Sequence, residues 1–242
     1  MPSPIYKPKG AALEYAEWGL NIYDSCPHGC TYCFARPMAK RFGKPWGSEV
    51  KPRPGLLEAL NKQLSSKAWQ NAGRLVHLCF TCDPYPVGHD SSMTREVIKA
   101  IKASGNHVQI LTKGDETAQR DFDLLDSNDW FGVTLSGAHD LPDVYEPYAA
   151  TETLRAMNLS AAHRRGISTW VSCEPVLCPE AIEPLLYYGF VDLWRIGKLN
   201  HQSSDINWRQ FGHKIEALCQ YFGRIYYIKN ALRKEMESHD AN

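Results

Sequence analysis

Three cysteines lie close together near the start of the chain, at Cys26, Cys30 and Cys33. Their spacing is CxxxCxxC, and Pro27 and Gly29 favour an irregular loop in which the sulfur atoms converge instead of radiating from a helix. Thiolates are the ligands that iron–sulfur clusters require. Because electron-transfer [4Fe–4S] clusters ordinarily use four cysteines, a loop with three leaves one iron free to bind a substrate or cofactor.

A zinc site is the alternative interpretation, with His28 or a distant cysteine as the fourth ligand. Structural zinc sites usually consist of two separated ligand pairs. No second pair repeats this spacing, but Cys79 and Cys82 form a CxxC that would serve as one. Metal content separates the two interpretations, since about four irons with sulfide indicate a cluster and one zinc indicates a binding module.

The elements that must position these cysteines alternate between strands and helices. Short apolar segments bounded mostly by Gly, Asp or Ser predict strands at residues 19–23, 75–80, 107–111, 130–135, 168–172, 192–196 and 224–228. Amphipathic spacing and cap residues predict helices at 56–64, 93–103, 153–165, 180–188 and 206–222. Residues 1–17, punctuated by Pro and Gly, are expected to form an extended N-terminal segment.

This alternation favours an α/β fold with parallel strands joined by right-handed crossovers. Six or seven such units would make a partial TIM barrel of the (β/α)6 type, while a doubly wound open sheet would show the same pattern. We expect one domain over residues 1–242, with its core at about 18–230. In both architectures the working site lies at the carboxyl ends of the strands, so the residues after each strand are candidates for chemistry.

The charge balance and the hydropathy of the sequence argue against a general nucleic-acid coat protein and against a membrane-spanning protein. The 27 Lys and Arg balance 27 Asp and Glu, so a surface that coats nucleic acid generally is not indicated. A local basic stretch follows the cysteines, and it is either a groove for a phosphate backbone or a solvated surface. It contains Lys40, Arg41, Lys44, Lys51 and Arg53, with Phe42 and Trp46 interleaved. No apolar run approaches the ~20 residues of a membrane span, and the start of the chain lacks a signal-peptide pattern, so we expect a cytoplasmic protein without a membrane partner.

The cysteine motif, followed by an aromatic residue and placed after the first strand of a β/α chain, resembles the signature of the radical S-adenosylmethionine (SAM) superfamily. Residues 18–36, 81–95, 110–121, 146–155 and 171–176 resemble the spore photoproduct lyase-related group, often labelled DNA repair photolyase. The similarity spans about residues 18–200. It implies a [4Fe–4S] cluster on Cys26, Cys30 and Cys33, bound SAM, and reductive cleavage of SAM to a 5′-deoxyadenosyl radical that abstracts hydrogen.

The resemblance also implies roles for residues that follow the strands. Tyr32 and Phe34, which flank the last ligand, would cover the cluster or touch the adenine. Lys113 would pair with the SAM carboxylate, and Ser136 would hydrogen-bond the ribose or the methionyl end. The structural alternatives are that Lys113 caps a turn and that Ser136 only ends a strand.

Two further residues belong to this implied cofactor site. Cys82, at the second strand end, would approach SAM and is the one weak candidate for a catalytic residue, while Glu174 would point toward the barrel mouth. A spore photoproduct lyase carries a hydrogen-donating cysteine near the second strand end, where this chain has Phe80. The tyrosine that follows the third cluster ligand in that group is Phe34 here. These departures argue against thymine-dimer repair, not against radical chemistry.

The resemblance implies a lyase-like or modifying enzyme whose substrate is a nucleic acid or nucleotide. It also implies an electron donor such as flavodoxin or ferredoxin. The same barrel would accommodate modification of a peptide or a small metabolite. A non-catalytic zinc or Fe–S binding protein is the alternative from another functional class.

Overall fold

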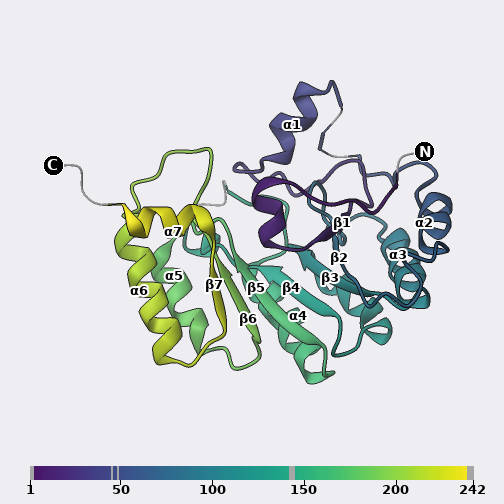
Figure 1. The fold of residues 1–242 in the computed structure, drawn as a ribbon. Helices are drawn as coiled ribbons and strands as arrows, with labels where there is room; N and C mark the ends of the chain where they lie inside the picture. Colours follow the sequence, from purple (N-terminus) through teal and green to yellow (C-terminus); the bar gives the residue numbers. More distant parts are fainter. Residues whose placement is uncertain (1–2, 45, 48, 142–144, 239–242) are drawn as a thin grey trace.

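The computed structural model describes residues 3–44, 46–47, 49–141 and 145–238. Its centre is one sheet of seven parallel strands that pair in chain order, from β1 to β7, and curve into a half-barrel (Figure 1). The strands are β1 (Trp18–Leu20), β2 (Leu75–Leu78), β3 (His107–Thr112), β4 (Trp130–Thr134), β5 (Ser168–Cys173), β6 (Leu193–Ile196) and β7 (Tyr226–Ile228). The predicted partial barrel of parallel strands is therefore confirmed, and the open-sheet alternative is not needed.

Helices connect the strands along the outside of the sheet. They are α1 (Ala35–Arg41), α2 (Leu56–Leu64), α3 (Ser92–Ala103), α4 (Glu152–Arg164), α5 (Pro179–Ile182), α6 (Trp208–Tyr221) and α7 (Asn230–Glu237). Figure 1 shows α2, α3 and α4 along one half of the sheet and α5, α6 and α7 along the other, while α1 stands clear of the barrel. In the described parts of the chain, no helix combines the length and the apolar character that a bilayer span requires.

The strands are buried on both faces, as parallel strands covered by helices must be. Val108, Ile110, Phe131 and Val133 have no exposed surface. Inside the barrel the Trp170 indole donates to the Ile110 carbonyl at 2.9 Å. This packing gives the strand ends a rigid base, from which the loops at their carboxyl ends project.

The N-terminal segment was predicted to be extended, and this prediction is wrong for residues 10–14. They form a 3-10 helix, Gly10–Glu14, that lies against the last strand. The Glu14 carboxylate accepts hydrogen bonds from the Tyr227 hydroxyl at 3.0 Å and from the Asn230 backbone N–H at 2.8 Å. These partners lie more than two hundred residues along the chain, so no local pattern could have indicated the helix.

The helix predicted at 180–188 is also only partly correct. It begins at Pro179, where a proline fits the first turn, but it ends at Ile182 and continues as a 3-10 helix, Glu183–Tyr187. Pro184 explains the change, because it lacks an N–H and its ring crowds the preceding turn of an α-helix. The sequence patterns also missed α1, α7 and a 3-10 helix at Glu116–Leu124.

The first predicted strand, 19–23, is shorter than expected and ends at Leu20. Residues 21–23 leave the sheet and bind other partners instead. The Asn21 side chain accepts the Thr81 backbone N–H at 2.9 Å, and Tyr23 forms an isolated antiparallel bridge with Pro52. This early exit starts the loop that carries the three cysteines above the barrel.

Candidate active site

A cavity of about 430 Å³ opens at the carboxyl ends of the strands, where both candidate architectures placed the site. Its volume lies within the range of small-molecule and cofactor pockets. Its lining includes residues at or beyond the carboxyl end of each of the seven strands. They include Cys26, Cys30, Cys33, Cys82, Asp83, Lys113, Thr134, Glu174, Lys198 and Lys229. The expectation that the site lies at the residues after each strand therefore identified the region of this cavity correctly.

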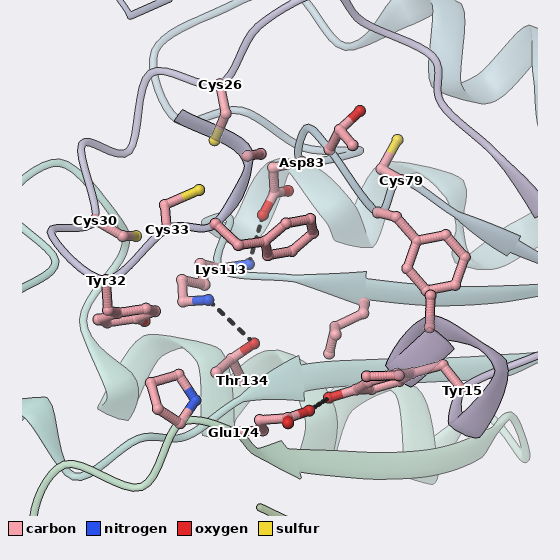
Figure 2. Close-up of a pocket in the computed structure, with 18 of the residues that line it drawn as sticks. Tyr15, Cys26, Cys30, Tyr32, Cys33, Cys79, Asp83, Lys113, Thr134 and Glu174 are labelled. Atoms are coloured by element: carbon pink, nitrogen blue, oxygen red, sulfur yellow. Dashed lines mark hydrogen bonds between the residues drawn. The ribbon is translucent and has the colours of Figure 1, made fainter. Parts of the chain in front are cut away.

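The cysteine loop, residues 26–33, brings its three thiols to one side of this cavity. Figure 2 shows the sulfur atoms of Cys26, Cys30 and Cys33 above Lys113 and Tyr32. All three cysteines are free, and Cys30 is buried while the other two are half-buried. Burial raises the pKa of Cys30 to about 11, although the Lys113 ammonium opposes the shift. Burial also raises the pKa of Cys26. These thiols therefore stay protonated unless a metal displaces their protons.

His28 was the proposed fourth zinc ligand, and the structure commits both of its ring nitrogens to the protein. Nε2 accepts the Val87 backbone N–H at 3.1 Å, which places the ring proton on Nδ1. Nδ1 faces the Asp83 carboxylate at 3.5 Å. Burial lowers the pKa of His28, so the ring is neutral. His28 anchors the cysteine loop and offers no free nitrogen to a metal.

The separation of the sulfur atoms tests which metal group they fit. Three sulfurs bound to one zinc at about 2.3 Å would lie roughly 3.8 Å apart. Among the described residues, the one group of three or more candidate ligands whose atoms all lie within 4.8 Å of one another is His107, Asp126 and Asp129, not the cysteines. That group already holds the Lys102 ammonium, 2.5 Å from Asp129. At least two of the three cysteine sulfurs therefore lie more than 4.8 Å apart, farther than three sulfurs bound to a single zinc would.

Asp83 ties the cysteine loop to two strand ends. Its carboxylate accepts the Thr112 hydroxyl at 2.5 Å, the Tyr85 N–H at 2.8 Å and the Lys113 N–H at 2.8 Å. The same carboxylate faces His28. The sequence analysis assigned Asp83 no role in the site. Its contacts show that it also fixes the position of Lys113 relative to the loop.

Lys113, a half-buried residue, presents its ammonium group to the cavity. Its Nζ lies 3.4 Å from the Thr134 hydroxyl and 5.5 Å from the centre of the Tyr32 ring (Figure 2). Burial lowers the pKa of Lys113, but the nearby Cys30 and Glu146 outweigh it, and the pKa is raised overall. The group is therefore a fixed cation beside the cysteines, suited to bind the carboxylate of a ligand.

A buried ion pair holds the opposite side of the cysteine loop. Arg155 binds Glu146 at 2.5 Å and also donates to the Thr134 and Ala150 carbonyls at 2.9 and 2.8 Å. The Tyr32 hydroxyl donates to the same Glu146 carboxylate. Both residues lie in a segment that carries the family resemblance, 146–155, but the sequence analysis gave neither of them a functional role. The Arg155–Glu146 ion pair therefore contacts the cavity through Tyr32, whose hydroxyl it holds in place.

The backbone of residues 145–148 also clamps the loop. The Thr31 N–H donates to the Tyr145 carbonyl at 3.0 Å, and the Tyr148 N–H donates to the His28 carbonyl at 3.2 Å. Gly29 has a φ of +68°, and a Cβ there would lie 3.0 Å from the Tyr148 ring. This contact requires glycine at the centre of the CxxxC segment.

The structure brings most of the predicted cofactor residues together. Tyr32, Phe34, Cys82, Lys113 and Glu174 all line the cavity. Phe34 is 53% exposed and lies at its mouth.

Ser136 is the exception, because it is fully buried and is not among the lining residues. Its hydroxyl hydrogen-bonds Glu152 at 3.0 Å and Glu146 at 3.2 Å. Its contact with a cofactor stays a prediction.

Glu174 is engaged by two residues that the sequence interpretation missed. The Tyr15 hydroxyl donates to its carboxylate at 2.5 Å (Figure 2). The Lys229 ammonium binds the same carboxylate at 2.7 Å. Burial, followed by the charge of Glu174, raises the pKa of Tyr15 well above its usual range. Lys229 follows the last strand directly, so the strand-end rule could have found it. Tyr15 had no local signal.

His77 is another missed residue of the cavity wall, inside β2 and 1% exposed. Within the described chain its Nδ1 has no hydrogen-bond partner. Burial, with the charges of Arg195 and Lys229, lowers its pKa to about 3. Since an unfolded histidine binds a proton near pH ~6.5, the unfolded state binds more protons below that pH, and stability is lost from there down to the folded pKa.

We therefore expect His77 to contribute a pH-dependent loss of stability of about 1 kcal/mol between pH 7 and pH 5.5. Urea unfolding at both pH values measures the loss. The His77→Leu variant should lose less on acidification than the parent protein by this amount. Equal losses in the two proteins would show that His77 is not held neutral.

We compared the chain with family models, curated relatives and solved structures. No family model matches the chain. An uncharacterized protein of Methanocaldococcus jannaschii is 28% identical over 233 residues, covering 92% of this chain and 84% of the relative. An uncharacterized protein of Mycobacterium tuberculosis is 28% identical over 181 residues, covering 70% of this chain and 52% of the relative. The chain thus spans about half the length of the mycobacterial protein, and neither relative has a described function.

Solved structures resemble the chain over most of its length. A variant of spore photoproduct lyase matches with a TM-score of 0.70 at 11% identity, covering 94% of this chain and 79% of the lyase. A lyase variant with bound AdoMet and dinucleoside spore photoproduct matches with a TM-score of 0.62 at 13% identity, covering 93% of this chain and 65% of that one. Streptococcus suis SuiB bound to S-adenosylmethionine matches with a TM-score of 0.62 at 10% identity, covering 93% of this chain and 53% of SuiB.

Proposed function

We propose that this chain, which has the partial TIM-barrel fold of radical SAM enzymes related to spore photoproduct lyase, is itself a radical SAM enzyme. The observation that carries the proposal is the convergence of Cys26, Cys30 and Cys33 in a cavity that also presents the Lys113 ammonium. The sulfurs are not all within 4.8 Å of one another, and both ring nitrogens of His28 are engaged by the protein; both observations favour a cluster over a single zinc.

The three cysteines would hold a [4Fe–4S] cluster and leave one iron open to SAM. When bound, the cluster supplies the electron for reductive cleavage of SAM to a radical that abstracts hydrogen from the substrate. The chain's residues orient these groups. Lys113 would hold the SAM carboxylate, and Tyr32, fixed by Glu146, would cover the cluster from the β4 side. Phe34 would shield the cavity mouth from water.

A nucleic acid or nucleotide is the proposed substrate class. A solved neighbour of this fold binds a dinucleoside lesion product, and a basic patch lies here on and after α1, a helix whose first residue, Ala35, lines the cavity. Lys40, Arg41 and Lys44 are exposed, and Phe42 among them is 67% exposed. Exposed cations with an interleaved aromatic ring suit single-stranded nucleic acid. We call these four residues the α1 patch.

The rest of the predicted basic stretch is bound within the protein. Lys51 pairs with Glu49 at 2.5 Å, and Arg53 donates to the Tyr23 carbonyl at 2.9 Å. The proposed contact with phosphates is therefore confined to the α1 patch. A reduced flavodoxin or ferredoxin is the proposed electron donor, by analogy with the fold's known enzymes.

Anaerobic reconstitution with iron and sulfide, followed by reduction with dithionite in the presence of SAM, tests the proposed activity. We expect about four irons per chain and the formation of 5′-deoxyadenosine only in the reduced sample. Chromatography of the quenched mixture measures the product. One tightly bound zinc and no 5′-deoxyadenosine would sink the proposal.

Replacing Lys113 with Ala is expected to weaken SAM binding roughly 10- to 100-fold, because a hydrogen bond to a charged group contributes about 1.5–3 kcal/mol. Iron content should not change, since Lys113 is not a ligand. Equilibrium dialysis with labelled SAM measures the affinity. Lys113→Arg, which keeps the cation, should lose less. Unchanged SAM affinity in Lys113→Ala would remove this residue from the cofactor site.

Single-stranded oligonucleotides are expected to stimulate 5′-deoxyadenosine formation several-fold, with an effect that falls as salt is raised. Reversing the charge of the α1 patch (Lys40→Glu, Arg41→Glu and Lys44→Glu together) should remove this stimulation and leave the rate without oligonucleotide unchanged. Lys62→Glu with Lys67→Glu, exposed lysines outside the cavity, is the control. Equal stimulation of both variants would contradict a role for the α1 patch.

A further inference from the structure

The part of the cavity away from the cysteine loop has an aromatic wall, which consists of Tyr15, His77 and Phe80. The centres of the His77 and Phe80 rings lie 4.3 Å apart, with 32° between the ring planes. The Tyr15 ring centre lies 5.8 Å from that of His77 and 6.3 Å from that of Phe80. Figure 2 shows Tyr15 and Glu174 well apart from the three cysteines. The three rings therefore form one continuous surface, separate from the cysteine loop.

Phe80 is the ring of the aromatic wall on which a ligand can stack. It is half-buried, and His77 covers one side of its ring, so the rest of the ring faces the cavity. The Tyr15 ring is less available, because the Lys229 ammonium lies 3.9 Å from its centre. An accessible aromatic face in a pocket suits a planar ligand ring, and stacking of this kind contributes much of the affinity of proteins for unpaired nucleobases.

His77 carries a hydrogen-bonding atom that the protein does not use. Within the described chain, its Nδ1 has no hydrogen-bond partner, although the residue is only 1% exposed. Burial lowers the pKa of His77 to about 3, so the ring is neutral. A buried polar group without a partner is costly, and a bound ligand or an ordered water commonly satisfies it. The aromatic wall therefore suits a planar ligand that carries polar atoms better than a hydrocarbon ring.

Glu174 supplies a hydrogen-bond acceptor beside the aromatic wall. Its Oε2 atom accepts the Tyr15 hydroxyl at 2.5 Å and binds the Lys229 ammonium at 2.7 Å. Its Oε1 atom accepts, among the described residues, one long hydrogen bond of 3.3 Å from the Asn200 amide. A carboxylate oxygen accepts two hydrogen bonds, so Oε1 has room for a donor on a ligand. Because Lys229 already balances the charge of Glu174, a neutral N–H suits this position better than a cation.

We propose that the aromatic wall and Glu174 bind one unpaired base of a nucleic acid, with the base stacked on Phe80 and an N–H of its edge donated to Glu174 Oε1. This inference rests on the proposed function and names the place where its substrate binds. It makes Glu174 a contact of the substrate instead of a contact of SAM. Because the base uses its pairing edge, a duplex binds only with that base flipped out.

The α1 patch favours a nucleic acid over an aromatic peptide as the ligand. Helix α1 begins at Ala35, which lines the same cavity. A strand with one base on the aromatic wall would therefore leave the cavity near α1, and the cations of the α1 patch would hold its phosphates. The planar subsite and the basic patch together match the two parts of a nucleotide.

Fluorescence anisotropy of labelled single-stranded oligonucleotides, measured anaerobically with cluster- and SAM-loaded protein, tests this base subsite without any turnover. Three ligands of equal length are compared: oligothymidine, the same oligomer with N3-methylthymine, and a sugar–phosphate backbone without bases. Their phosphates are identical, so differences in affinity come from the bases. We expect the parent protein to bind oligothymidine roughly 10-fold more tightly than either of the other two ligands.

Phe80→Leu keeps an apolar side chain and removes the ring. It should weaken the binding of oligothymidine roughly 10-fold and leave the affinities for the base-free backbone and for SAM unchanged. Phe222→Leu is the matched control, because Phe222 is also half-buried and packs 4.7 Å from the Tyr187 ring, outside the cavity. This control should bind all three ligands as the parent protein does. Circular dichroism shows that both variants are folded.

The proposal is overturned if Phe80→Leu and Phe222→Leu bind oligothymidine equally well, or if the N3-methylated oligomer binds the parent protein as tightly as the unmodified one. Binding of N-acetyltryptophanamide that depends on Phe80, without such a dependence for oligothymidine, would also overturn it and indicate an aromatic peptide side chain. Absence of SAM cleavage together with the expected effect of Phe80→Leu would remove the proposed radical function and support the base subsite.

Discussion

Replacing Cys30 with Ala is expected to abolish cluster binding and 5′-deoxyadenosine formation together. Cys30 is the middle ligand of the three and the most buried, and its sulfur lies beside the Lys113 ammonium. The variant would keep only two of the three thiolates, and no other described cysteine lies in the loop to replace Cys30 as a ligand. Iron analysis and chromatography on the reconstituted variant, compared with the parent protein, measure both losses.

The matched control is Cys178→Ala, because Cys178 is half-buried and does not line the cavity. It should retain iron and activity at the level of the parent protein. Circular dichroism of both variants before reconstitution shows whether each chain is folded. Full SAM cleavage by a folded Cys30→Ala protein would contradict the assignment of the cluster.

Arg155→Ala is expected to lower the free energy of unfolding by about 3–5 kcal/mol, the usual cost of breaking a buried ion pair on one side. Arg155 is 2% exposed, and every contact it makes is internal. Its loss leaves the Glu146 carboxylate buried without its strongest partner and frees the Thr134 and Ala150 carbonyls. Urea unfolding of the two proteins under the same conditions measures the difference.

The double variant Arg155→Met with Glu146→Gln distinguishes the contribution of the ion pair to stability from the contribution of side-chain packing. Because it removes both charges and keeps similar volume, it should be less destabilised than Arg155→Ala. It should also hold iron less well than its stability alone would suggest, since Tyr32 loses the carboxylate that fixes it. A loss below about 1 kcal/mol in Arg155→Ala, the scale of an exposed pair, would show that the pair is solvated.

The sequence by itself was enough to predict which cysteines would ligate a cluster, and it located the region of the site. Cys26, Cys30 and Cys33 are local in the chain, so their spacing was sufficient to predict a shared metal group. Strand periodicity then predicted a parallel barrel, and a parallel barrel collects the residues after its strands at one end. Lys113 and Cys82, which the resemblance assigned to the cofactor site, follow β3 and β2 in this way and line the cavity.

Tertiary structure decided which residues surround the three cysteines. Tyr15 reaches Glu174 across 159 positions, and Tyr32 reaches Glu146 across 114, so no pattern within one element encodes either contact. Ser136 follows its strand as Lys113 does, yet Glu152 draws its hydroxyl away from the cavity. The spacing of residues within a loop determines which chemistry that loop can perform. Burial and long-range hydrogen bonds determine which other side chains face the loop. The folded barrel alone brings those distant carboxylates and phenols beside the cysteines.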